Sequence, residues 1–106
     1  MQLYGIKNCD VVKKTRKFLE NKGVHFDFVD YRETPIAEEK LQNWIDHVGK
    51  DVLLNTKSTT WRSLSDSEKQ QDVLTLFANH PTLIKRPGLE TKSGILVGYK
   101  DIEANF

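Results

Sequence analysis

Cys9 is the residue of this chain best suited to covalent chemistry. It follows a short apolar segment, Gln2–Ile6, and directly precedes a helical pattern that starts at Asp10. The N-terminus of a helix has unpaired N–H groups and the positive end of the helix dipole, which together favour a thiolate over a thiol. Lys13, four residues further on, adds positive charge on the same helix face. The alternative is an inert buried cysteine, and the residues alone leave both readings open.

Two further segments have residue types that bind anions or peptides. Arg86-Pro87 comes just before a predicted strand, where the proline sets either a cis bond or an ordinary trans turn. The bare sequence favours trans, because cis accounts for only about 5–6% of X–Pro bonds. The second segment, Asn55–Arg62, has hydroxyl groups, two cations and Trp61. It fits an anion or peptide site, but a solvated loop with Trp61 in the core is the interpretation that we favour.

Composition and charge exclude several classes of protein. With one cysteine the chain cannot form an internal disulfide, which argues against a secreted, disulfide-stapled fold and fits a reducing cytoplasm. His25, His47 and His80 lack the spacing of metal ligands. A net charge of +1 argues against nucleic-acid binding driven by bulk charge. No apolar run reaches the roughly 18 residues of a membrane helix. We therefore expect a cytoplasmic protein with no metal, no nucleic-acid partner and no membrane span.

The first third of the chain predicts a strand–helix–strand unit. Its elements are a strand at Gln2–Ile6, a helix from Asp10 to Lys22 and a strand at 26–31. A unit of this length joins two parallel strands through a crossover helix. A second helix is expected to open at Thr34-Pro35, with the threonine as N-cap and the proline in the first turn.

The rest of the chain predicts helices, then a hairpin. Ser65–Glu68 has the form of a capping box, and we expect its helix to continue to Asn79. Two short strands, Leu89–Thr91 and Ile95–Gly98, are joined by a turn, and a terminal helix follows. A chain of 106 residues forms one domain. The predicted class is α/β, with a mixed four-stranded sheet flanked by helices.

Several motifs together resemble the arsenate reductase (ArsC)/Spx family, with the greatest likeness to its YffB-like branch. The likeness extends from the first strand to Val97-Gly98-Tyr99. The motifs that carry it are Tyr4-Gly5-Ile6-Lys7-Asn8-Cys9-Asp10, Lys13-Lys14 with Arg16, Asp30-Tyr31-Arg32, Leu53-Leu54-Asn55-Thr56, Thr59-Thr60-Trp61-Arg62 and Ile84-Lys85-Arg86-Pro87.

The resemblance implies a single thioredoxin-like domain over residues 1–106, with a helical insertion at about 32–86 between the second and third strands. It also implies that Cys9 is the redox nucleophile, that Pro87 is a cis-proline facing it, and that Arg86 contacts a bound oxyanion or thiol adduct. By the same resemblance, the residues that bind the substrate thiol are Asn8, Lys13, Asn55, Arg86 and Pro87.

Two departures from the family pattern bear on function. Asn55 stands where arsenate reductases have an arginine, which disfavours arsenate as the substrate. Cys9-Asp10-Val11-Val12 has no second cysteine, so the C-x-x-C switch of Spx-type regulators is excluded. The resemblance then implies a thiol–disulfide oxidoreductase that binds no cofactor and uses glutathione as co-substrate, with glutaredoxin as a possible partner. Two alternatives stay open: an arsenate reductase that uses glutathione and glutaredoxin, and a non-enzymatic, Spx-like regulator that binds RNA polymerase.

Overall fold

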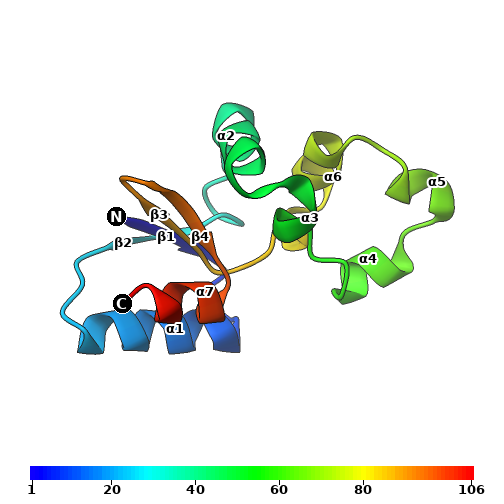
Figure 1. Ribbon diagram of the computed structural model, residues 1–106. Helices are drawn as coiled ribbons and strands as arrows, with labels where there is room; N and C mark the ends of the chain where they lie inside the picture. The colour runs from blue at the N-terminus through cyan, green and yellow to red at the C-terminus, as the bar shows by residue number, and fades with distance from the viewer. The chain divides into compact units, whose positions relative to one another are not determined.

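The strands form one mixed four-stranded sheet in the computed structural model, which describes all residues 1–106 (Figure 1). The strands are β1 (Gln2–Gly5), β2 (Asp27–Asp30), β3 (Gly88–Thr91) and β4 (Gly94–Val97), in the spatial order β2-β1-β3-β4. β1 pairs with β2 in parallel and with β3 antiparallel, and β3 and β4 form an antiparallel hairpin. The predicted α/β class, with its mixed four-stranded sheet, is confirmed.

The chain forms two compact units. The first comprises residues 1–35 and 86–106 and includes the sheet. The second comprises residues 36–85, is mostly helical, and lies in the chain between β2 and β3.

Two helices of the first unit pack on one face of the sheet, α1 (Asp10–Asn21) and α7 (Tyr99–Ala104). Their contact with the sheet is a cluster of fully buried side chains from β1, α1, β3 and α7: Leu3, Leu19, Leu89 and Ile102. Burying each such side chain contributes roughly 1.5–3 kcal/mol. Because this cluster joins α1 to β1, it fixes the helix whose first turn follows Cys9.

Gly5 lets α1 approach the end of β1 closely. A Cβ atom at Gly5 would lie 2.7 Å from Cγ2 and 3.0 Å from Cγ1 of Val12. Val12 is fully buried in the first turn of α1, and its branched side chain has little freedom to move aside. The glycine is therefore required by packing.

The second unit is built from short helices: α2 (Glu38–Val48), α3 (Lys50–Leu53), α4 (Thr59–Ser63), α5 (Asp66–Lys69), α6 (Val73–Asn79) and the 3₁₀ turn Pro81–Leu83. An isolated antiparallel bridge joins Leu54, which follows α3, to Ile84, near the C-terminal end of this unit. Its buried apolar side chains include Leu41, Trp44, Leu53, Leu64, Leu76, Phe77 and Leu83. None of the chain's helices is long and apolar enough to cross a membrane.

Two predicted helix boundaries are wrong. The helix expected to open at Thr34-Pro35 begins at Glu38, with Ala37 as N-cap. The Thr34 N–H donates to the carbonyl of Asp30 at 2.9 Å, so this residue closes the turn after β2. The helix expected from Ser65 to Asn79 is two helices. The capping box at Ser65 is present, but Asp72 accepts a hydrogen bond from the Leu74 N–H and starts a second helix.

The segment Asn55–Arg62 is not the simple loop that we favoured. The Ser58 hydroxyl accepts a hydrogen bond from the Trp61 N–H at 3.1 Å and caps α4. Trp61 is half-buried, and the Lys69 ammonium lies 5.4 Å from the centre of its ring. Local capping by a serine therefore orders a segment whose composition is typical of loops.

We predict that Gly5→Ala destabilises the protein by about 1–3 kcal/mol, because the added methyl group forces the first turn of α1 away from β1. The measurement is urea denaturation followed by circular dichroism. Gly88→Ala is the matched control, since a Cβ atom there meets its nearest neighbour, Cδ1 of Ile95, at 3.4 Å. Equal stability of the two variants would contradict the packing argument.

Candidate active site

Cys9 is the N-cap residue of α1. Its backbone is extended, with φ −95° and ψ 124°, and its carbonyl accepts the first helical hydrogen bond from the Lys13 N–H at 3.0 Å. The Cys9 N–H donates to the carbonyl of Ile6 at 3.2 Å, which closes the turn between β1 and the helix. The side chain is partly exposed and its thiol is free. The prediction that Cys9 opens the first helix is confirmed.

Arg86 is the charged residue that acts on this thiol. Tyr4 of β1 pairs with Gly88 of β3, so the residues that lead into β3 lie at the end of the sheet where β1 leads to Cys9. There the Arg86 guanidinium lies close enough to the Cys9 thiol and to the Tyr31 hydroxyl to lower the pKa of each through hydrogen bonding and charge. The Arg86–Pro87 peptide is cis, as the resemblance implied, and Pro87 is buried.

Opposing effects set the pKa of Cys9. Partial burial raises it, because a thiolate loses hydration. Two other influences lower the pKa: the N–H groups of Val12 and Val11 in the first turn, and the hydrogen bonding and charge of Arg86. Together they outweigh burial, so the pKa of Cys9 is lowered. No cap hydrogen bond of regular geometry reaches the sulfur, so the helix N-terminus acts on it mainly through its electrostatic field. The site therefore favours the thiolate.

Tyr31 also belongs to the site, although the sequence analysis gave it no function. It is 2% exposed, and its N–H donates to the carbonyl of Gly5 at 3.1 Å, just beyond the paired part of β1 and β2. Burial is the main cause that raises the pKa of its phenol, and the positive charge of Arg86 only partly offsets it. Its hydroxyl thus stays neutral and holds the guanidinium that contacts Cys9. The only sequence signal for it was the motif Asp30-Tyr31-Arg32.

The other predicted site residues lie in different surroundings. Asn8 is exposed in the turn before Cys9, and Lys13 is exposed in the first turn of α1. Lys13 is not among the groups that act most strongly on the Cys9 thiol, so its part in binding stays a prediction. Asn55 belongs to the second unit, where its side-chain oxygen accepts a hydrogen bond from the Lys57 N–H at 3.2 Å. Of the predicted residues, the structure thus places Arg86 beside the Cys9 thiol, and Pro87 follows Arg86 through the cis bond.

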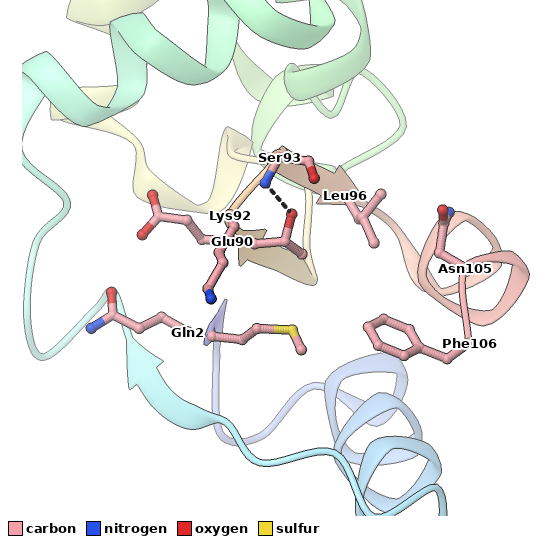
Figure 2. A pocket seen from close by; sticks show the side chains of 9 residues that line it. Gln2, Glu90, Lys92, Ser93, Leu96, Asn105 and Phe106 are labelled. Atoms are coloured by element: carbon pink, nitrogen blue, oxygen red, sulfur yellow. Dashed lines mark hydrogen bonds between the residues drawn. The ribbon is translucent and has the colours of Figure 1, made fainter.

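A pocket of 720 Å³ lies at the opposite end of the sheet (Figure 2). It is lined by the start of β1, the β3–β4 hairpin and the last residues of the chain, including Gln2, Lys92 and Phe106. β1 runs away from this pocket toward Cys9, so the pocket is separate from the thiol. No group of three or more His, Cys, Asp or Glu side chains is arranged to hold a metal ion.

Comparison with known proteins gives a consistent picture. A sequence profile described as the ArsC family matches residues 4–105. An uncharacterised protein of Haemophilus influenzae is 38% identical over 105 residues, which cover 95% of this chain and 92% of that protein. The global transcriptional regulator Spx of Bacillus subtilis is 26% identical over 106 residues, covering 95% of this chain and 81% of the regulator.

Solved structures share the fold over almost the whole chain. A protein named YffB superposes with a TM-score of 0.90 at 37% identity, covering 98% of this chain and 95% of that one. An arsenate reductase related protein from Brucella melitensis has a TM-score of 0.76 at 36% identity, covering 92% and 84%.

We predict that the pH midpoint for alkylation of Cys9 lies below the free-thiol value of about 8.5, because the thiolate is the reacting species. Arg86→Met should raise this midpoint, since it removes both a hydrogen bond to the sulfur and a positive charge. Lys13→Met removes one charge from the exposed face of α1 and should change the midpoint less. The rate of iodoacetamide modification as a function of pH measures all three. A larger shift for Lys13→Met than for Arg86→Met would contradict the assignment of Arg86.

Proposed function

Because this chain belongs to the ArsC family, whose sequence profile matches residues 4–105, we propose that it is a single-cysteine thiol–disulfide oxidoreductase that uses glutathione. The observation that carries the proposal is the partly exposed Cys9 at a helix N-terminus, with a pKa lowered by the Val12 N–H and by Arg86 although burial opposes this. A poised thiolate of this kind attacks disulfides.

The proposed reaction has two exchange steps. In the first, the Cys9 thiolate attacks one sulfur of a disulfide R–S–S–R′, a bond forms between Cys9 and the R sulfur, and R′ leaves as a thiolate that takes a proton from solvent. In the second, the thiolate of glutathione attacks the R sulfur and releases Cys9 as a thiolate. The products are R′–SH and R–S–S–glutathione, so glutathione supplies the electron pair.

An external thiol is required because Cys9 is the chain's only cysteine. Arg86 contributes at both steps, since it stabilises Cys9 as the attacking group in the first and as the leaving group in the second. A lower pKa also makes a thiolate a weaker nucleophile, so Arg86 favours the leaving-group role more than the attack. This chemistry belongs in a reducing compartment, and we place it in the cytoplasm with glutaredoxin as a possible partner.

Arsenate reduction is the less favoured function. The reason is charge: a dianionic oxyanion needs several cations, and Asn55 offers a neutral amide where the family pattern has an arginine. Each lost charged hydrogen bond costs about 1.5–3 kcal/mol of binding. We expect wild-type protein with glutathione and glutaredoxin to show no arsenate-dependent oxidation of glutathione. Efficient turnover in that assay would establish the arsenate reductase alternative.

We predict that oxidised glutathione converts the wild-type protein to a mixed disulfide, and that Cys9→Ser abolishes this while the fold is kept. A serine hydroxyl fits a helix N-cap and is nearly isosteric, but it does not ionise near neutral pH. Intact-mass spectrometry should show one added glutathione on the wild type and none on the variant. Reduced glutathione should then restore the original mass.

The matched control for that experiment is thermal unfolding of both proteins, which should give similar midpoints because a partly exposed thiol adds little to the core. If the wild type stays folded yet unmodified at excess oxidised glutathione, the oxidoreductase proposal is wrong. The non-catalytic alternative, a regulator similar to Spx, would then become the favoured hypothesis.

A further inference from the structure

Asp30, at the end of β2, is a buried carboxylate that the proposed chemistry does not use. It is 9% exposed, one of two buried polar or charged side chains besides the apolar core. Burying a carboxylate is costly unless it is hydrogen-bonded, so its partners indicate what it is for. Both of its oxygens accept hydrogen bonds from backbone N–H groups.

Those two bonds join segments that are far apart in the chain. Oδ2 accepts from the Lys7 N–H at 3.0 Å, in the turn that leads from β1 to Cys9. Oδ1 accepts from the Arg32 N–H at 2.9 Å, in the turn directly after Tyr31. The parallel pairing of β1 with β2 ends at Gly5 and Asp30. The carboxylate therefore continues the connection between the two strands into the turn that positions Cys9.

The same turns carry the two groups that meet at Arg86. Lys7 is two residues before Cys9, the thiol whose pKa Arg86 lowers. Arg32 is one residue after Tyr31, the phenol on which Arg86 also acts. A carboxylate that ties these turns together also sets the separation of the sulfur and the phenol. That separation decides whether one guanidinium can reach both.

We infer that Asp30 is a positioning residue, whose carboxylate clamps the turn before Cys9 to the turn after Tyr31 and so holds the thiol within reach of Arg86. The inference rests on the proposed function, because the position of the thiol matters for catalysis only if Cys9 is the nucleophile. The carboxylate is ionised throughout the neutral range: burial raises the pKa of Asp30, but the N–H groups of Lys7, Arg32 and Glu33 and the charge of Lys7 outweigh this and lower it.

A simple charge effect of Asp30 on Cys9 would have the opposite sign. A negative charge near a thiol disfavours the thiolate, so removal of that charge alone lowers the pKa of the thiol. Loss of the clamp instead lets the sulfur move away from Arg86, and both hydrogen bonds and Coulomb attraction weaken with distance. The direction of the change in Cys9 reactivity thus separates positioning from charge.

Asp30→Asn and Asp30→Ser test the inference. An Asn or Ser side chain can keep the local bond to the Arg32 N–H, two residues on, as such residues do in turns. If the asparagine Oδ1 accepts from the Arg32 N–H, its Nδ2 group faces the Lys7 N–H, and two donors cannot bond to each other. The serine side chain is too short to reach Lys7. Both variants therefore lose the connection between the turns while they keep the local one.

We expect both variants to raise the pH midpoint of Cys9 alkylation by about 0.5–1 unit, toward the value of a free thiol. Asp27→Asn is the matched control, since Asp27 is an exposed carboxylate on the same strand, and it should leave the midpoint unchanged. In an Arg86→Met background the Asp30 variants should add little, because both changes remove the same interaction. Circular dichroism and thermal unfolding establish that each variant is folded.

An unchanged or lowered midpoint in the folded Asp30 variants overturns the inference, as does an additive effect with Arg86→Met. Failure of both variants to fold also overturns it, in favour of a purely structural role. Alkylation needs no glutathione, so this result is independent of the mixed-disulfide experiment. A wild type with a low midpoint that never reacts with oxidised glutathione would refute the proposed function and leave the positioning role of Asp30 intact.

Discussion

The electrostatic interaction of the Arg86 guanidinium with the Cys9 thiol is the one on which the rest of the candidate site depends. Burial by itself would raise the pKa of the thiol and leave it inert. The field of the helix N-terminus works against burial, and Arg86 adds a full charge that can form a directional bond. Arg86 is itself held by Tyr31, which is buried and neutral. Tyr31 thus holds Arg86, and Arg86 in turn stabilises the Cys9 thiolate.

The sheet positions these three residues. Cys9 follows β1, Tyr31 follows β2, and Arg86 leads into β3, and these three strands lie side by side in the order β2-β1-β3. Because β1 is parallel to β2 and antiparallel to β3, the C-terminal ends of β1 and β2 and the N-terminal end of β3 lie at the same end of the sheet (Figure 1). Gly5 permits α1 to begin close to this edge, since a larger residue would meet Val12. The packing requirement and the chemical requirement therefore fall on the same turn.

The likeness to YffB and to an arsenate reductase related protein shows the same fold used across one family. The oxyanion of arsenate and a disulfide make different demands on charge, because the first is an anion and the second is neutral. Our proposal for this chain follows from that difference, since Arg86 is the cation that acts on the Cys9 thiol. The single cysteine adds a second constraint, because resolution of a mixed disulfide must come from another molecule.

The sequence by itself determined most of the elements and singled out Cys9 as the candidate nucleophile. Apolar spacing predicted β1, α1 and the hairpin, and the same spacing placed Cys9 at the start of a helix, because these signals act within one or two turns of the chain. Whether the thiol was activated or inert stayed open from the residues alone. The same local signals misplaced the start of α2, since Thr34 is taken up by a turn with Asp30. The cis Arg86–Pro87 bond came from family likeness, against the local preference. Family likeness also gave Arg86 as a site residue, and only the tertiary structure added Tyr31 and Asp30 to the surroundings of Cys9. Strand register and burial bring them together, and neither can be read from the residues that flank each one.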